Sequence, residues 1–589
     1  MDNRSSSASG PFTEIAVIGA GPRGVVVVER LVAAARSHEF HGRLRVHLID
    51  PFVHTGGSVW RSDQPRTLLM NTLTCQTTMY PDDSCSPRFP APEGALTFDQ
   101  FLTDYERWEF APRAEHGRYI AHVLHKAIAD APEHVEIQLY EGEVRDLERE
   151  DDDRQTLRIR TPSGDASIRA DQVILALGHL RTEVSVRGRS FQNFAAENDL
   201  AFAPPENPLD VDYAQFLDRE RIAVQGMGLN FYDVIGMLTE AAGGRFVPDE
   251  SVPHRLRYEP SGREPVLVVG SRTGMVYRPK PDISPEIPEP FELRVLTDER
   301  VAQLSATLQG LDYEADVLPL MMQELQEAIS TGGYEPPRVE DMERELFPLG
   351  RRSVSLDDAH DQTVAELRRA TERSLPEADG RWLLLFRVLV ALKGQINELA
   401  RRGAFTAGSF LRDVDGFLRN ALASWTSGPP VLRGQQLLAL VDAGLVEFTG
   451  PGMSIGLDHA AGRFTVRAGD GPVTLCDGVL LAHLPPVQLD AFTSPLIRSL
   501  KRRGEITPAR LPLPQPDEAP PTGSIDLADD FHPVTVHGHA DDDRLFLGVP
   551  VSTAQPGSSI TAAPGSGAQL LRFAEAAVIL ALTAEGNLL

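Results

Sequence analysis

The chain has 589 residues, of which 42% are hydrophobic and 24% are charged. This length predicts two to four domain-sized units, and the composition is that of a folded globular protein rather than a disordered or fibrous one. The 84 acidic residues outnumber the 57 lysines and arginines, and the formal charge of −27 has the wrong sign for affinity gained by neutralising phosphates, so we expect no nucleic-acid partner.

The cysteines and the N-terminus indicate the cellular compartment in which the protein is expected. Cys75, Cys85 and Cys476 are too few for a disulfide scaffold or a four-cysteine zinc site. Residues 1–14 are polar and lack an apolar signal core, and no apolar run is long enough to cross a bilayer. We therefore predict a disordered tail over 1–14, no membrane segment and a cytoplasmic location, and the sequence leaves the oligomeric state open.

The first predicted element group reads strand, glycine turn, helix, strand. A β-branched run over Ile15–Ile18 precedes a glycine-rich turn at 19–24, an apolar periodic stretch covers Val25–Ala35, and a second strand pattern over Arg43–Ile49 ends at Asp50. Further strands are predicted at 135–140, 157–160 and 172–176, with a hairpin turn at the acidic run 150–153.

The glycine turn Gly19-Ala20-Gly21-Pro22-Arg23-Gly24 has the spacing of a dinucleotide-binding motif. Gly19 allows the tight turn out of the strand, Gly21 lets the backbone approach a pyrophosphate, and Gly24 lets the helix pack closely on the strand. Asp50, at the end of the next strand, is expected to accept hydrogen bonds from ribose hydroxyls.

A second cycle of the same kind begins at Ile222. The turn Gly226-Met227-Gly228-Leu229 follows a short strand and opens a helix to about Ala242, and Asn230 or Phe231, depending on register, replaces the third glycine. The next strand ends in Gly270-Ser271-Arg272. An arginine at that place suits a 2′-phosphate, so the turn predicts NADPH rather than NADH, although an exposed turn arginine is the alternative.

The remaining patterns complete an α/β fold class with two dinucleotide-binding, Rossmann-like domains and a large α-helical insertion in the second half. Amphipathic helices are predicted between about 297 and 425, strands at 445–449, 463–467, 478–482 and 544–549, a linker or surface crossing at 508–521, and a helix at 568–582. The predicted order is an FAD-binding domain over 15–205 and 491–589, an NADP-binding domain over 206–296 and 431–490, and the insertion over 297–430.

Several motifs together resemble those of flavoproteins with two dinucleotide-binding domains. The loop Gly56-Gly57-Ser58-Val59-Trp60 after Asp50-Pro51 is similar to the Gly-Gly-x-Trp loop of class B flavoprotein monooxygenases, and Leu175-Ala176-Leu177-Gly178 is similar to the Ala-Thr-Gly segment that closes their FAD domain. Four further blocks of sequence resemble actinomycete-type FAD/NAD(P)-binding proteins, a group that includes amino-acid N-monooxygenases of the nitrosuccinate synthase kind. These blocks are Gly21-Pro22-Arg23-Gly24 with Glu29-Arg30-Leu31, Leu68-Leu69-Met70-Asn71-Thr72, Gly226-Met227-Gly228-Leu229, and Tyr258-x-Pro260-Ser261-Gly262-x-Glu264-Pro265.

The resemblance implies an NADPH-dependent flavoprotein that hydroxylates the amino nitrogen of a small amino acid with O2, L-aspartate foremost, toward nitrosuccinate in a nitrite-forming secondary-metabolite pathway. It implies FAD contacts at Gly19, Gly21, Pro22, Arg23, Gly24, Asp50, Pro51, Gly57, Ser58, Trp60, Asn71, Gly178 and Gly548. It implies NADP contacts at Gly226, Gly228, Leu229, Asn230, Ser271 and Arg272, and substrate contacts at Arg61, Arg66 and Asn71.

The sequence departs from the class B pattern in three places. It has no Phe-x-Gly-x-x-x-His run, Leu177 replaces the threonine of Ala-Thr-Gly, and the strand that ends at Gly548 lacks the usual Gly-Asp pair. A flavin oxidoreductase without oxygen insertion and a non-catalytic dinucleotide-binding sensor are the alternatives. No residue is predicted to act as a catalytic acid or base, and the pair His122 and His125 lacks a carboxylate partner at metal-binding spacing.

Overall fold

A computed structural model describes residues 11–284, 286, 288–307, 309–347, 358–376, 380–513 and 519–588. The chain divides into two compact units. The first consists of residues 1–183, 486–510 and 521–589, and the second of residues 184–485 and 511–520. Residues 1–10 of the predicted tail and 514–518 of the predicted linker lie outside the described residues.

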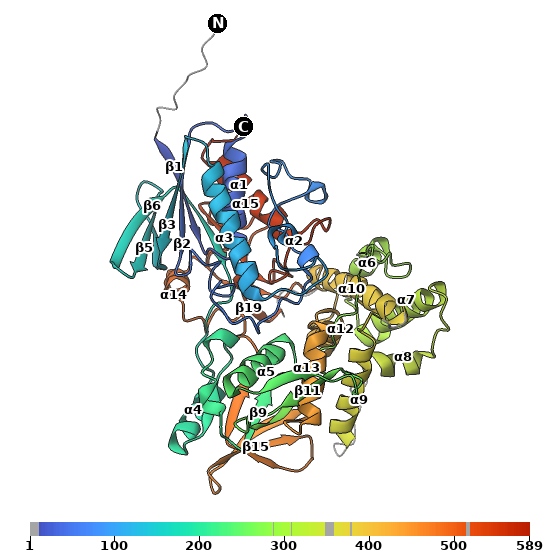
Figure 1. Ribbon diagram of the computed structural model, residues 1–589. Coiled ribbons are helices and arrows are strands. Elements are labelled where there is room, and N and C mark those ends of the chain that lie inside the picture. The colour runs from blue at the N-terminus through green and yellow to red at the C-terminus, as the bar shows by residue number, and fades with distance from the viewer. Residues whose placement is uncertain are drawn as a thin grey trace. The chain divides into compact units, whose positions relative to one another are not determined.

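The first unit is built on a parallel five-stranded sheet in the order β20-β7-β1-β2-β3 (Figure 1). Its strands are β1 (Phe12–Ile18), β2 (Arg43–Asp50), β3 (Val135–Glu141), β7 (Gln172–Leu177) and β20 (Arg544–Gly548). The tail is therefore shorter than predicted, because Phe12 to Glu14 already pair with Arg43 to Arg45 of β2.

Alternate side chains of β1 point to opposite faces of this sheet, and a separate layer of secondary structure packs on each face. Ile15 and Val17 pack on one face with the helices α1 (Pro22–Ala35), α3 (Arg113–Asp130) and α15 (Gln569–Ala584). Ala16 and Ile18 pack on the other face with a small antiparallel sheet and α14 (Pro495–Arg502). That sheet contains β4 (Glu143–Arg149), β5 (Gln155–Thr161) and β6 (Gly164–Ala170), and a two-stranded pair of β18 (Pro508–Arg510) and β19 (Pro521–Ile525) lies in the same unit. α2 (Phe98–Phe101) is a single turn.

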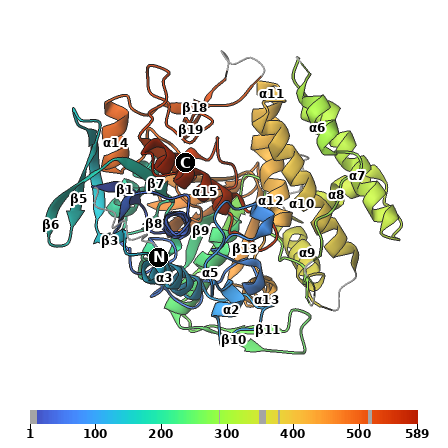
Figure 2. The same cartoon turned by 90° about the horizontal axis from the view of Figure 1, so that it is seen from above.

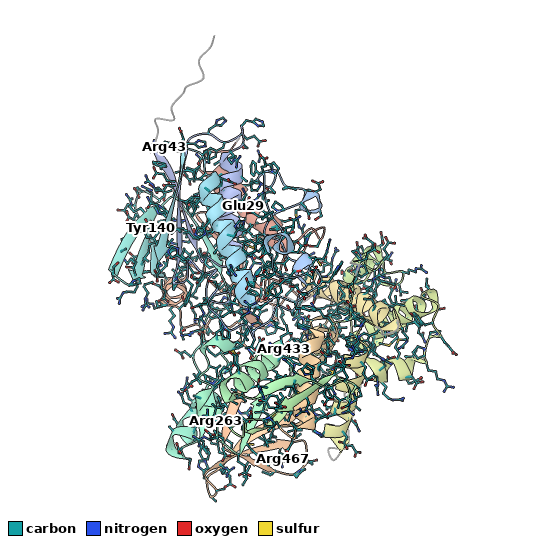
Figure 3. The ribbon with its side chains drawn as sticks, in the orientation of Figure 1. Glu29, Arg43, Tyr140, Arg263, Arg433 and Arg467 are labelled. Carbon is teal, nitrogen blue, oxygen red and sulfur yellow. The ribbon has the colours of Figure 1, made fainter. Side chains whose placement is uncertain are left out.

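Helix α1 is buried along nearly its whole length, and it carries an ion pair inside the core. Glu29, labelled in Figure 3, accepts two hydrogen bonds from Arg30, at 2.5 and 2.6 Å. Arg30 is fully buried and also lies 3.6 Å from Glu575 of α15. The pair joins α1 to α15, and burial raises the pKa of Glu29.

The second unit repeats this architecture with a parallel sheet in the order β13-β12-β9-β17-β8. Its strands are β8 (Ala201–Ala203), β9 (Arg221–Gln225), β12 (Val266–Ser271), β13 (Val446–Pro451) and β17 (Gly478–Leu481). The helices α5 (Leu229–Ala242) and α13 (Val431–Asp442) share one core with this sheet. The other face carries α4 (Val186–Glu197) and an antiparallel sheet of β14 (Met453–Asp458), β15 (Arg463–Ala468) and β16 (Thr474–Cys476). A pair of β10 (Arg245–Pro248) and β11 (Leu256–Glu259) adjoins α13.

A helical segment lies between β12 and β13 in the chain (Figure 2). Its buried side chains form an apolar core of their own. Its elements are α6 (Asp298–Ser305), a π-helical turn over Tyr313–Val317, α7 (Leu318–Thr331), α8 (Val339–Leu346), α9 (Ala359–Glu372), α10 (Gly380–Arg401), α11 (Ala407–Ser409), a second π-helical stretch over Phe410–Leu418, and α12 (Arg419–Thr426).

The predicted fold class is confirmed: two parallel sheets each follow a strand, glycine turn, helix, strand pattern, and helices intervene in the second half. The first unit ends at Glu183, ahead of the predicted domain boundary at residue 205, because β8 pairs with β17 of the second sheet. Within the described residues, no helix combines the length and the apolar character needed to cross a membrane.

Candidate functional site: two glycine turns

The first glycine turn connects β1 to α1, and two of its glycines are required by close packing. A β-carbon on Gly19, whose φ is +108°, would lie 2.5 Å from the carbonyl oxygen of Ala176 on β7. A β-carbon on Gly24 would lie 1.8 Å from the carbonyl oxygen of Gly19. Only glycine fits at either position, which explains the first and third glycines of the motif.

Gly21 is different, because a β-carbon there meets no atom of the described residues within 4 Å. Gly21 is the N-cap of α1, and the helix has neither a side-chain cap nor an acidic residue in its first turn. Within the described part of the chain, no side chain therefore caps the first backbone N–H groups of α1, and uncapped N–H groups at a helix N-terminus are the arrangement that binds phosphate. Gly178, at the end of β7, is exposed and has similarly open surroundings.

Arg23 brings a buried positive charge to this turn. Its side chain donates to the carbonyl oxygen of Ser558 at 2.9 Å, and its Nε has no hydrogen-bond acceptor among the described residues. Burial lowers the pKa of Arg23 to about 10. A β-carbon on Gly548, whose φ is +111°, would lie 3.3 Å from the Arg23 guanidinium, so the last strand ends beside the same charge. A buried guanidinium with an unused donor fits an anionic pyrophosphate.

Asp50 holds the turn in place. Its two carboxylate oxygens accept hydrogen bonds from the backbone N–H groups of Ala20, at 2.8 Å, and Phe52, at 2.6 Å. Burial raises the pKa of Asp50, while these two hydrogen bonds lower it. The carboxylate therefore fixes the end of β2 against the glycine turn, and a contact with ribose stays a prediction. Pro51 follows it at an exposed position.

The predicted Gly-Gly-x-Trp loop lies against the first turn. Gly57 has a φ of +78°, and a β-carbon there would lie 2.8 Å from the backbone nitrogen of Gly21. Gly56 packs on α3, where a β-carbon on Gly117 would lie 1.9 Å from the carbonyl oxygen of Trp60. The backbone thus brings Trp60 and the exposed Ser58 to the same end of the sheet as the turn.

His116 is a neighbour of Trp60 that sequence reasoning missed. Its ring is fully buried and meets the Trp60 ring edge-on at a centroid distance of 4.6 Å. In the part of the chain that the structure describes, neither ring nitrogen has a hydrogen-bond partner. Burial lowers the pKa of His116 to about 3, so the ring is neutral at physiological pH. The neighbouring Gly117 was the only local signal, because a glycine inside a helix indicates close backbone approach.

The three predicted substrate contacts have partners within the first unit. The Arg61 guanidinium lies over the Phe52 ring, 5.1 Å from its centroid. Arg66 forms an ion pair of 2.9 Å with the buried Glu115 and donates to the hydroxyl of Tyr105.

Glu115 also pairs with Arg118 at 2.9 Å, so two exposed guanidinium groups share one buried carboxylate. Arg66 is therefore already partly neutralised by the protein itself. Asn71 is half-buried on the segment between the Gly-Gly-x-Trp loop and α3, and its side chain also has partners in the protein.

The second glycine turn, between β9 and α5, has the same backbone geometry as the first. Gly226 has a φ of +129°, and a β-carbon there would lie 2.5 Å from the carbonyl oxygen of Ala482, the same distance as at the first turn. Gly228 caps α5 as Gly21 caps α1. Phe231 stands three residues after Gly228, where Gly24 stands in the first turn, and it is fully buried.

Asn230 and Leu229 occupy the first turn of α5, and Asn230 donates weakly to the carbonyl oxygen of Glu206, at 3.4 Å. A tyrosine covers this second turn. A β-carbon on Gly228 would lie 3.4 Å from Cζ of Tyr277, so the ring occupies the space that is open at Gly21. Tyr277 donates its backbone N–H to Met227 at 3.1 Å. No sequence signal pointed to Tyr277, because it follows the turn by almost fifty residues.

The structure brings Arg272 to this turn as the sequence predicts. The backbone N–H of Gly226 donates to Gly270 at 2.9 Å, which joins the turn to the end of β12. Arg272 is exposed, and its guanidinium makes no hydrogen bond or ion pair within the described residues. Ser271 accepts from the backbone N–H of Gly274 at 2.9 Å, which orders the loop.

Comparison with known proteins agrees with this geometry. Residues 16–180 match a family described as FAD-NAD(P)-binding, and this match confirms the prediction that the chain binds FAD and a nicotinamide dinucleotide. The contacts of each predicted residue with these cofactors stay predictions.

The chain is 28% identical to an L-aspartate N-monooxygenase (nitrosuccinate-forming) of Streptomyces cremeus, over 95% of this chain and 93% of that protein. It is 28% identical to the nitrosuccinic acid synthase of Aspergillus oryzae, over 97% of this chain and 93% of that protein. The predicted resemblance to nitrosuccinate synthases is thus confirmed. An ornithine N-hydroxylase of Kutzneria has 12% identity and a TM-score of 0.42, over 98% of this chain and 100% of that one.

Proposed function

We propose that the chain is an FAD- and NADPH-dependent monooxygenase that oxidises the amino nitrogen of a small amino acid, L-aspartate foremost, toward nitrosuccinate. The observation that carries the proposal is the similarity to two aspartate-oxidising enzymes over almost the whole of each chain. The two glycine turns support it, because each has the form of a dinucleotide site.

The residues of the first unit would hold the flavin rather than perform acid–base chemistry. Gly21 and the N-terminus of α1 would receive the pyrophosphate, and the guanidinium of Arg23 would contribute a positive charge beside it. Bound FAD supplies the redox chemistry and the activation of O2. The chain orients the substrate amine and excludes water, which is why no catalytic acid or base is needed from the protein.

The preference for NADPH would depend on Arg272. Its guanidinium is exposed and has no ion-pair partner among the residues that the structure describes, and at the end of the strand after the glycine turn it would bind a 2′-phosphate. An acid at this position would instead bind the ribose hydroxyl of NADH.

Substrate-dependent oxygen uptake tests the proposal. We expect the FAD-loaded protein to consume NADPH and O2 faster when L-aspartate is added, and to form hydroxylamino or more oxidised nitrogen products. If aspartate and a panel of other amino acids leave the rate of NADPH oxidation unchanged and only hydrogen peroxide accumulates, the chain is a flavin oxidoreductase that does not insert oxygen.

The substrate carboxylates require cationic partners, and the predicted substrate contacts Arg61, Arg66 and Asn71 supply too little free positive charge for both. Arg66 is paired with Glu115, so a substrate carboxylate at Arg66 would compete with the buried carboxylate of Glu115. We retain Arg61 and Asn71 as contacts to be tested with Arg66, and a second source of positive charge is needed for a dicarboxylic amino acid.

A further inference from the structure

Arg118 is an exposed arginine on an otherwise buried stretch of α3. Residues 114–117 and 119–120 are buried, whereas the side chain of Arg118 is 63% exposed. Its guanidinium donates to Glu115, one helical turn earlier, at 2.9 Å, and it has no other hydrogen-bond or ion-pair partner among the described residues. A guanidinium carries five N–H donors, so most of those of Arg118 are not used within the described part of the chain.

Glu115 is a buried carboxylate that Arg118 shares with Arg66. One of its oxygens accepts from Arg118 and the other from Arg66, each at 2.9 Å. The Glu115 side chain is only 7% exposed, so this carboxylate fixes one N–H group of each guanidinium in place. Two positive charges and one negative charge leave these three side chains with one uncompensated positive charge.

The backbone holds these side chains against the Gly-Gly-x-Trp loop. The backbone N–H of Arg113, at the start of α3, donates to the carbonyl oxygen of Leu68 at 2.7 Å, which fixes the segment that carries Arg66. A β-carbon on Gly117, the residue before the exposed arginine, would lie 1.9 Å from the carbonyl oxygen of Trp60. The two guanidinium groups therefore belong to segments that pack directly on the loop beside the proposed flavin site.

A shared carboxylate is not by itself a binding site. Arg401 and Arg402 share Glu398 on α10 in the same way, at 2.6 and 2.7 Å. Glu398 is 30% exposed, and its partners follow it within one turn of the same helix, where solvent screens such pairs. Glu115 differs because it is buried and joins two segments of chain, so its two guanidinium groups are held together at one place.

This arrangement suits a second carboxylate, supplied by a ligand. Guanidinium groups bind carboxylate oxygens through pairs of N–H groups, and Glu115 leaves most of these N–H groups unused. The ligand carboxylate would balance the uncompensated charge, so it need not displace Glu115. Arg118 would thus remove the competition that a substrate carboxylate meets at Arg66 alone.

We propose that Arg66 and Arg118, held by Glu115, form a guanidinium clamp that binds one carboxylate of a dicarboxylic amino acid. The identity of the ligand as the substrate rests on the function proposed above, whereas the clamp itself rests on the buried, shared carboxylate. A phosphate of FAD or NADPH has related chemistry, and the experiments separate these sources.

The first experiment compares Arg118→Gln with Arg402→Gln, the matched change in the shared pair on α10. Glutamine keeps a good helix former at both positions. Binding of L-aspartate and succinate to the oxidised, FAD-loaded protein is measured by calorimetry, together with the flavin content and the Kd for NADP+. We expect Arg118→Gln to weaken aspartate and succinate binding by about five- to fiftyfold, the effect of losing a charged hydrogen bond that solvent partly screens. The flavin content and the Kd for NADP+ should change less than about twofold, and Arg402→Gln should change none of these.

The second experiment uses the unaltered protein, so it does not depend on how a variant folds. Arginines are modified with phenylglyoxal with and without L-aspartate, and the modified sites are followed by mass spectrometry. We expect aspartate to slow the modification of Arg66 and Arg118, while Arg401 and Arg402 react as before.

The outcomes separate the clamp from the function. If Arg118→Gln lowers the flavin content or weakens only NADP+ binding, the clamp holds a cofactor phosphate and the carboxylate assignment is wrong. Unchanged aspartate binding in Arg118→Gln, or absence of dicarboxylate binding to the unaltered protein, would also overturn the assignment. If aspartate and succinate bind through Arg118 but no amino acid stimulates O2 uptake, the clamp stands and the proposed monooxygenase function fails.

Discussion

Adding one methyl group to each of two neighbouring glycines should separate cofactor binding from folding. Gly21→Ala adds a methyl group where no protein atom lies within 4 Å, and the local φ of −71° and ψ of −176° suit any residue. Replacing glycine by alanine at a helix N-cap costs about 1 kcal/mol at most, so the fold should persist. The methyl group would nevertheless occupy the space that a pyrophosphate needs.

The expected loss of affinity follows from the backbone donors at this turn. If the methyl group prevents two charged hydrogen bonds, the loss is about 3 to 6 kcal/mol, or about a hundred- to more than ten-thousandfold in the Kd for FAD. Gly24→Ala is the matched contrast, because its methyl group would lie 1.8 Å from a backbone oxygen and must displace the helix. That variant should lose stability by several kcal/mol whether or not FAD is present.

Flavin absorbance per chain and thermal unfolding of the FAD-free protein measure the two effects. Gly21→Ala should purify with little flavin and with the unfolding temperature of the FAD-free parent, whereas Gly24→Ala should unfold at a lower temperature. A Gly21→Ala protein that retains one FAD per chain would refute the reasoning, because the open space would then not be where the pyrophosphate binds.

Three further changes test the other parts of the site. Arg272→Ala should raise the Kd for NADPH by about ten- to a hundredfold and leave NADH use unchanged, and equal losses with both would make the arginine structural. Tyr277→Ala should tighten NADP+ binding because the ring covers Gly228, and weaker binding would instead indicate that the ring stacks on the dinucleotide. His116→Phe should remove a pH dependence of stability. The pKa of His116 is about 3 in the folded protein and about 6.5 in the unfolded chain, so the parent should lose about 2 kcal/mol of its free energy of unfolding between pH 7.5 and pH 5.0. Thermal unfolding measures this loss, and equal losses in the parent and the variant would refute the reasoning.

The glycine turns could be predicted because their requirements are local. Gly19 and Gly226 are fixed by contacts with the backbone at the ends of adjacent strands, and Gly24 is fixed by the backbone of its own turn. These contacts recur wherever a strand, tight turn and helix meet in a parallel sheet. Arg272 was predictable for the same reason, because the end of the neighbouring strand always lies beside the turn. Burial and period-two alternation likewise predicted the central strands.

The partners of the side chains could not be predicted, because they come from distant segments. Glu115 neutralises Arg66 across 49 positions of sequence, and nothing near Arg66 indicates a buried acid. Tyr277 covers Gly228 from the loop that follows β12.

The contrast between the two turns has a functional meaning under the proposed reaction. Both sheets build the same backbone, since a β-carbon on Gly19 or Gly226 meets the same obstacle at the same 2.5 Å. The first turn leaves Gly21 open and adds the buried charge of Arg23, which favours a resident cofactor held through many turnovers. The second turn places Tyr277 over Gly228 and offers the exposed Arg272. A dinucleotide bound there would have to displace the ring, which would weaken its binding and would suit a cosubstrate that leaves after each hydride transfer.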